Sequence, residues 1–300
     1  MANYLSIDKR KQIFHLLCEG NGLRAITRLV KCSTCAVSEL QKRYCHIIEF
    51  LNRKYITGLC IDEIEADELR TFIAKKDNIR WIYVAMDRNS RMVIHFHIGK
   101  RDTEDAKIFL VGLSHKLSSV SQVATDCLKS YVSAVERTPY GRIEAAVSSI
   151  GLLRSARAGE RLGRAITNRI ETHNGTIRQH ISRLARRTRC FSKKEEGLRQ
   201  HLTLFFFYYN FIKRHKSLKA TPALVAGITD EAFWINKILE YDMLFTETAN
   251  NTNSKKTYGL VENVPNEVKS IGQSDIDEFR KELIGLDGIK TKAKVIKLAG

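Results

Sequence analysis

The stretch I-R-W-I-Y-V-A-M-D-R-N-S-R-M-V-I-H-F-H-I-G, residues 79–99, decides the fold class of this chain. Two runs rich in β-branched and aromatic residues flank the polar tetrapeptide D-R-N-S, a pattern typical of two strands joined by a tight turn. Upstream, E-L-R-T-F-I-A-K (68–75) has the same character, and K-K-D-N separates it from the next run. Three sequential strands with short turns predict an antiparallel meander.

The segments after the meander change from strand to helix and back. The sequence D-T-E-D-A-K-I-F-L-V-G-L-S-H-K-L (102–117) predicts a helix with Asp102 as its N-cap. The next apolar run, V-S-Q-V-A-T-D (120–126), predicts a further strand that ends at an acid. Three strands, a helix and a strand predict an α+β fold with a mixed sheet.

The N-terminal segment, residues 1–50, predicts short helices only. Within 22–43 the pattern is that of a helix, a tight turn and a second helix capped by Ser33. Lys31 occupies the turn position where glycine is usual. A helix-turn-helix would bury Ile26, Cys32, Val37 and Leu40, and would direct Thr34, Ser38 and Lys42 toward a DNA groove. A plain helical hairpin remains the alternative.

The C-terminal half predicts helices over 166–212 and a short helix over 230–245, followed by a polar linker at 249–256. Segment 137–165 has weak periodicity and receives no assignment. We therefore expect three parts: a helical domain (1–50), a domain that contains the mixed sheet (60–228), and a C-terminal helix and tail (229–300).

The charge balance points to a polyanionic partner. The chain has 50 Lys and Arg against 33 Asp and Glu, a net charge of +17, and nucleic acid is the usual partner of such a protein. No apolar run approaches the roughly 18 residues that span a bilayer, and no signal peptide is visible, so we expect a cytoplasmic protein without a membrane partner. The 7 scattered cysteines predict reduced thiols, and C-S-T-C (32–35) lacks the second close pair that a zinc site needs.

One acid stands among many arginines in R-I-E-T-H-N-G-T-I-R-Q-H-I-S-R-L-A-R-R-T-R-C (169–190). On a helix, four apolar residues form one stripe, while Glu171, Asn174 and Arg178 lie on its flank. Arg183, Arg186 and Arg187 point away from the stripe, and we expect these basic residues to hold a DNA phosphate backbone. The stripe consists of Ile170, Ile177, Ile181 and Leu184. An ion pair between Glu171 and Arg178 spans two turns and is too long. A hard cation such as Mg²⁺ is the other possible partner of this carboxylate.

Two further acids could join Glu171 at a metal site. Asp126 ends a predicted strand, where ligands gather in helix-covered sheets, and Asp67 begins the first predicted strand. Phosphodiester chemistry commonly uses two divalent ions about 4 Å apart. The alternatives are that Asp67 belongs to a solvated acidic cluster at 62–68, and that Asp126 caps a following helix.

Four blocks of the sequence resemble insertion-sequence transposases. They are I-E-A-D-E-L-R-T-F-I-A-K-K, V-A-T-D-C-L-K-S-Y, I-E-T-H-N-G-T-I-R with I-S-R-L-A-R-R-T, and F-Y-Y-N-F-I-K-R-H-K-S-L-K-A-T-P-A. Together they span roughly residues 10–245, and the nearest type is the insertion-sequence-one family. The resemblance implies a ribonuclease-H-like catalytic domain with an Asp-Asp-Glu site, preceded by a helix-turn-helix domain. Cys127 departs from the family's glycine after the second Asp.

Carried over by position, the resemblance implies that Asp67, Asp126 and Glu171 are catalytic and bind two Mg²⁺ or Mn²⁺ ions. It implies that Asn174 and Arg178 contact the element's DNA end, and that His215 is structural or faces DNA. The implied partners are double-stranded DNA, at element ends and target, and further copies of the chain assembled on that DNA in the nucleoid.

The expected activity is that of a DNA transposase, with metal-dependent cleavage at element ends and strand transfer into target DNA. One alternative is a catalytically inactive DNA-binding protein, either a repressor or a decayed transposase copy. Another is a nuclease of the same fold that cuts without joining strands.

Overall fold

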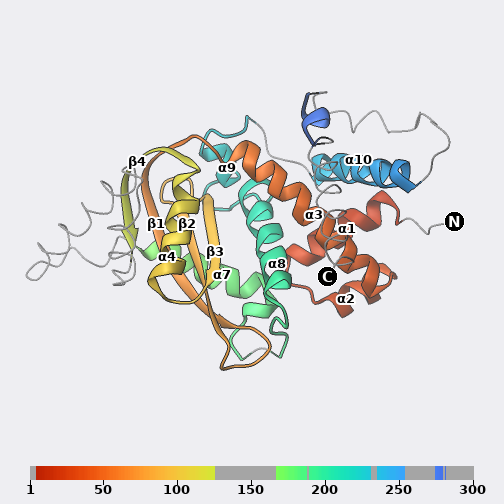
Figure 1. The fold of residues 1–300 in the computed structure, drawn as a ribbon, viewed down its shortest axis with the longest axis horizontal. Helices are drawn as coiled ribbons and strands as arrows, with labels where there is room; N and C mark the ends of the chain where they lie inside the picture. The colour runs from red at the N-terminus through yellow and green to blue at the C-terminus, as the bar shows by residue number, and fades with distance from the viewer. Residues whose placement is uncertain are drawn as a thin grey trace, which may run out of the picture.

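The computed structural model describes residues 5–125, 167–187, 189–230, 235–253, 274–279 and 281. Asp126 and segment 137–165 lie outside these residues. In the described part, a four-stranded sheet carries helices on both faces, and a group of helices packs at one end of it (Figure 1).

The sheet has the order β3-β2-β1-β4. Strands β1 (Leu59–Phe72), β2 (Ile79–Asp87) and β3 (Val93–Gly99) pair antiparallel, and β4 (Leu117–Thr125) runs parallel to β1. The expected meander and the mixed α+β sheet are both confirmed.

Strand β1 starts well before the expected position. It begins at Leu59, so Asp67 lies inside the strand rather than at its start. The acidic residues made this part of the strand hard to predict from the sequence, because acids normally face solvent and some of these do not. Glu65 and Glu68 are buried and pair with Arg88 and Arg101, respectively. The alternative of a uniformly solvated acidic cluster was therefore wrong for these two residues.

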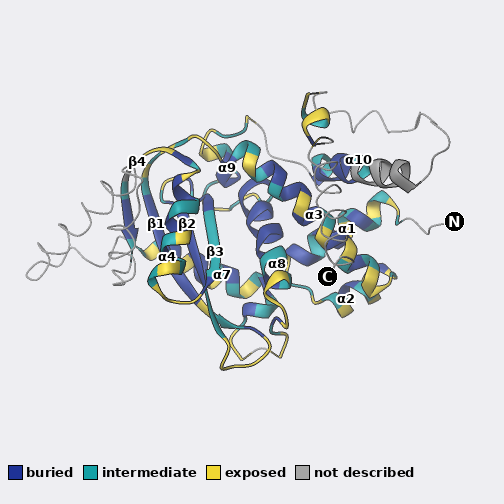
Figure 2. Ribbon diagram, viewed as in Figure 1, coloured by how far each residue is buried: buried dark blue, intermediate teal, exposed yellow. Residues whose placement is uncertain are grey.

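Helices cover the two faces of the sheet differently. Helix α4 (Thr103–Ser114), capped by the Asp102 carboxylate as expected, packs Phe109 against Tyr83 of β2. Helices α7 (Asn168–His180) and α8 (Glu195–Phe207) pack on the opposite face with Leu69, Ile82 and Val84. Because side chains alternate along a strand, Glu65, Asp67 and Leu69 share the α7 face of β1. Figure 2 shows buried residues concentrated in the strands and in α8.

The helix expected across 169–190 ends at His180. A short 3₁₀ turn (Ser182–Leu184) follows, and α8 begins only at Glu195. The guanidinium of Arg178 donates to the carbonyl of Leu184 at 3.0 Å, and this bond holds the segment after the helix close to the last turn of α7. The apolar stripe is nonetheless buried as predicted: Ile170, Ile177, Ile181 and Leu184.

The N-terminal helices are α1 (Ile7–Cys18), α2 (Leu23–Val30) and α3 (Thr34–Tyr55). Ser33 accepts a hydrogen bond from the Ala36 N–H, as its capping role predicts, and Lys31 takes the left-handed conformation with φ 54°. Helix α3 continues past residue 50 and packs along α8 (Figure 1). These helices therefore share one core with the α4 face of the sheet.

Of the C-terminal helices, α10 (Ile235–Asn253) packs against α1 and α3, whereas α9 (Pro222–Val225) packs against the π-helical segment Tyr208–Ile212. Helix α9 is short, and α10 extends beyond the expected end at 245. The first part of the expected polar linker, 249–253, is therefore helical. Farther on, Phe279 is buried against Phe50 and Tyr241. In the part of the chain that the structure describes, no helix has the length and apolar character of a membrane span.

Candidate active site

Asp67 and Asn174 join strand β1 to helix α7. The Asn174 Nδ2 donates to Asp67 Oδ2 at 2.7 Å, and the Glu68 N–H donates to Asp67 Oδ1 at 2.8 Å. Asn174 is buried and Asp67 is half-buried, so the carboxylate is oriented yet still reaches solvent.

Glu171 lies in the first turn of α7 and is exposed. The Thr167 hydroxyl donates to Glu171 Oε1 at 3.3 Å. Residues three apart are neighbours on a helix surface, so Glu171 lies next to Asn174 and on the flank of the helix that meets β1. The position of this acid at the helix N-terminus is electrostatically favourable.

The third predicted acid, Asp126, lies outside the described residues. Strand β4 is described as far as Thr125, whose partner on β1 is Ala66, the neighbour of Asp67. Among the residues that the structure describes, no three His, Cys, Asp or Glu side chains form a metal-binding group. Both described acids offer the carboxylate oxygens that a hard divalent cation takes, and Asn174 joins Asp67 to the helix that carries Glu171.

Arg178 connects the helix to the end of β1. Besides its bond to Leu184, its guanidinium donates to the carbonyl of Arg70 at 3.3 Å. Burial, and then the nearby Arg186, lower the pKa of Arg178. The residue thus has a structural role in addition to the DNA contact expected from the sequence.

The other expected DNA contacts fall into three places. Arg183, Arg186 and Arg187 follow the end of α7 and line a groove with Arg178. His215 donates through Nε2 to the carbonyl of Tyr209 at 3.1 Å and is half-buried. On α3, Thr34 and Lys42 are exposed and Ser38 is half-buried, and Lys42 pairs with Glu39 at 3.3 Å.

Glu65 is a site residue that the sequence analysis missed. Its side chain is completely buried, and its Oε2 accepts a hydrogen bond from the Ile170 N–H at 2.8 Å. Arg88 lies 3.4 Å from Oε1. Burial raises the pKa of Glu65, against the opposing effects of the Ile170 hydrogen bond and Arg88. The signal was its spacing, because residues two apart on a strand share a face, and Asp67 is two residues away.

His173 was also overlooked, in the middle of the expected site. Its ring lies 4.3 Å from that of Tyr209 and 6.1 Å from that of Phe206. Burial, and then His215 and His180, lower the pKa of His173 to about 3. Neither ring nitrogen has a hydrogen-bond partner among the described residues. His173 is therefore a neutral core residue beneath the site.

Comparison with known proteins places this helix in a family context. The profile of the IS1 transposase family matches residues 154–211, which include α7. The resemblance to insertion-sequence-one transposases is confirmed. The chain is 29% identical to the insertion element IS1 protein InsB of Shigella flexneri over 132 residues, 44% of this chain and 84% of that protein. The chain is 26% identical to the insertion element iso-IS1n protein InsB of Shigella dysenteriae over 132 residues, again 44% of this chain and 84% of that protein.

The family match bears unequally on the three predicted acids. It includes Glu171, Asn174 and Arg178 but neither Asp67 nor Asp126. Asp67 is linked to the matched segment by its hydrogen bond to Asn174.

Proposed function

We propose that this IS1-type chain is a metal-dependent DNA transposase that cleaves the ends of an insertion sequence and transfers the freed strand into target DNA. The hydrogen bond between Asn174 and Asp67 carries the proposal. It connects the family-matched helix of Glu171 to an acid in the central strand. The mixed sheet, with its parallel fourth strand, supports a ribonuclease-H-like catalytic domain over 60–228.

Asp67, Asp126 and Glu171 would hold two Mg²⁺ or Mn²⁺ ions. We include Asp126 because it follows Thr125, whose partner on β1 adjoins Asp67. When bound, such ions polarise a phosphodiester and lower the pKa of a nucleophilic water or hydroxyl. The chain's own contribution is orientation: Asn174 holds Asp67, and Glu65 holds the start of the helix that carries Glu171.

The proposed partner is double-stranded DNA, bound by several copies of the chain. The net charge of +17 supports a polyanionic partner. Helices α2 and α3 would act as a helix-turn-helix domain (1–50), presenting Thr34, Ser38 and Lys42 to the element end. Arg178, Arg183, Arg186, Arg187 and His215 would contact DNA nearer the acids. Activity on this substrate would place the protein at the nucleoid.

The test is strand cleavage and joining on a duplex that carries the element's own end. We expect Asp67→Asn and Glu171→Gln to abolish both reactions, and Asn174→Ala to slow them about 10- to 100-fold as a partner of a proposed metal ligand. Thr172→Ala, an exposed change on the same helix, is the matched control. Full activity of Glu171→Gln would exclude the proposal.

The same experiment separates the alternative, a DNA-binding protein without catalysis. Such a protein would bind the end duplex with a steep salt dependence, equally well with and without Mg²⁺, and would yield no nicked product. Cleavage without joining would instead identify a nuclease.

A further inference from the structure

A basic groove opens where the end of β1 meets the segment after α7. Its volume is about 800 Å³, and six arginines and one lysine line it, with no acid among the described lining residues. Arg178 and Arg183 are half-buried, whereas Arg70, Arg186 and Arg187 are exposed. Such a concentration of cations without neutralising carboxylates suits a polyanionic strand rather than a neutral ligand.

Two aromatic rings belong to the same groove. Phe72, the last residue of β1, and Phe191 both line it, and their ring centroids lie 5.1 Å apart. Both side chains are partly exposed, and neither belongs to the two hydrophobic cores. Contact with phosphates requires no aromatic ring, so the pair calls for a different explanation from the arginines.

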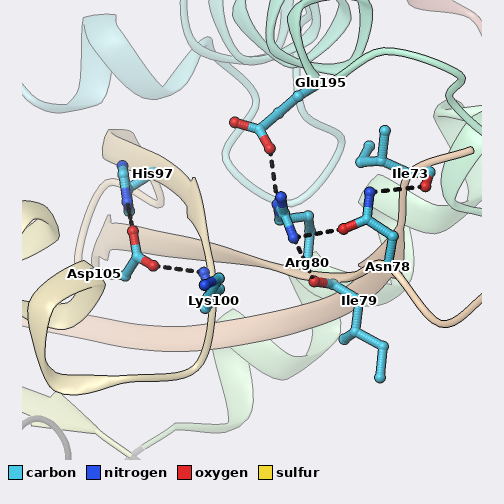
Figure 3. Close-up of polar contacts among 8 residues, drawn as sticks. All are labelled: Ile73, Asn78, Ile79, Arg80, His97, Lys100, Asp105 and Glu195. Atoms are coloured by element: carbon cyan, nitrogen blue, oxygen red, sulfur yellow. Dashed lines mark hydrogen bonds and ion pairs between the residues drawn. The ribbon is translucent and has the colours of Figure 1, made fainter.

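Hydrogen bonds hold the walls of the groove together. The Ala74 N–H, two residues after Phe72, donates to the carbonyl of Ser192, the residue after Phe191, at 2.8 Å. The turn after β1 is closed by Asn78, which donates to the Ile73 carbonyl at 3.1 Å (Figure 3). Arg80 bonds to Asn78 at 2.8 Å and to Glu195 at the start of α8 at 2.9 Å. These hydrogen bonds therefore fix the backbone segments that carry the two rings.

We propose that this groove binds unpaired nucleotides of single-stranded DNA, with phosphates on the arginines and a base stacked on the Phe72–Phe191 pair. Positive grooves with aromatic platforms bind single strands because every base has a stacking face, which is covered in a duplex. Arg178 lines the groove and lies one helical turn from Asn174, so the bound strand would lead toward Asp67. In this respect the inference rests on the proposed function.

The experiment measures binding of the full chain to an oligo-dT single strand and to a duplex, without divalent ions, so that no cleavage is involved. We expect Phe191→Leu to raise the single-strand Kd about tenfold and to leave the duplex Kd within about twofold. Arg186→Gln should weaken both. Phe96→Leu, which alters a partly exposed ring packed on Phe206 in another part of the sheet, is the matched control.

A second readout needs no variant. A single strand containing 2-aminopurine should lose fluorescence on binding to the wild-type chain, and Phe191→Leu should restore it. Unquenched fluorescence in the wild-type complex, or equal weakening of single-strand and duplex binding by Phe191→Leu, would overturn the inference and leave a groove for duplex phosphates only.

The failure of the groove assignment and the failure of the proposed function give different results. If the ring-dependent binding is found in a chain that never cleaves DNA, the proposed function fails and the groove assignment stands. If cleavage is normal and single-strand binding is independent of the rings, the groove assignment fails and the proposed function stands.

Discussion

Polar side chains at the proposed site have neighbours that compensate for lost water, whereas neither ring nitrogen of His173 has a hydrogen-bond partner in the part of the chain that the structure describes. Asp67 receives two hydrogen bonds and Glu65 receives one together with an arginine. His173 instead has aromatic neighbours, and its low pKa means that it is buried in the neutral form. The cost of burying a polar group without a partner is therefore accepted directly beneath the proposed site.

We predict that His173 contributes to acid lability. Its pKa in the folded chain, about 3, lies below the ordinary value of 6.5, so its contribution to stability is complete above pH 6.5 and is lost as the pH falls toward 3. Over that range one such group changes the unfolding free energy by about 1.4 kcal/mol per pH unit. His173→Phe should make the acid side of the stability curve less steep, measured by urea unfolding between pH 4 and 7. His115→Gln, a substitution of an exposed histidine, should leave the acid side of the stability curve unchanged. An unaltered slope in His173→Phe would refute this role.

At the scale of elements, helix α7 begins without a side-chain cap of its own. Thr167 makes no capping bond to the helix, and Glu65 from β1 accepts the Ile170 N–H instead. The strand thereby determines where the helix starts, and with it the position of Glu171. Helix α3 shows the ordinary arrangement, because Ser33 caps it from the preceding residue.

We predict that Glu65→Ala destabilises the fold by about 2 kcal/mol, because the buried Ile170 N–H loses its acceptor, whereas Arg88 keeps its ion pair with Glu63 at 2.9 Å. Glu65→Gln should cost less, since its amide oxygen can still accept the bond and no charge is desolvated. Because the pKa of Glu65 is raised in the folded chain, its ionised form opposes folding as the pH rises through that value. The free energy of unfolding of Glu65→Gln relative to that of the wild type should therefore be most favourable at neutral pH, as measured by urea unfolding. Equal losses for the two variants would argue against the capping role.

The turn between α2 and α3 offers a second element-scale prediction. Lys31 has φ 54°, a region that costs a residue with a Cβ atom about 1 kcal/mol and glycine very little. Lys31→Gly should raise the thermal midpoint, with a net gain of about 0.5–1 kcal/mol. Lys42→Gly, inside α3, should lower the midpoint, because glycine in a helix interior costs about 1 kcal/mol of stability. A lower midpoint in Lys31→Gly would show that the lysine side chain stabilises the turn in another way.

At the scale of the whole molecule, a buried ionic cluster joins α10 to the N-terminal helices α1 and α3. The Asp242 side chain on α10 is fully buried, 2.8 Å from Arg10 on α1 and 2.9 Å from Arg43 on α3. Through α3 and α8 the same core continues into the sheet. The C-terminal helix is thus part of the packing around the helices proposed to recognise DNA.

We predict that Asp242→Asn costs about 3–5 kcal/mol, because it leaves two arginines near an uncharged group in a buried place. The loss should appear as a lower urea midpoint of the full chain. Asp275→Asn, which removes a partly exposed ion pair with Lys54, should cost less than about 1 kcal/mol. Similar midpoints for the two variants would show that the cluster adds little to stability.

The strands of the meander, the α4 helix with its Asp102 cap, and the isoleucine stripe of α7 followed from local patterns. Each depends on the alternation or periodicity of apolar residues, which is visible in the chain itself. The early start of β1 and the end of α7 at His180 did not follow. In the first, buried acids disguised a strand, and in the second, Arg178 bonds to a carbonyl beyond the helix.

The sequence alone therefore determined the α+β class, the basic character and the candidate acids, because these depend on residue type and short-range spacing. Only the tertiary structure decided that Asn174 holds Asp67, that Glu65 caps α7, and that Phe72 meets Phe191 in a basic groove. These contacts join residues about a hundred positions apart, and their geometry arises from sheet pairing and helix packing, which no local pattern encodes.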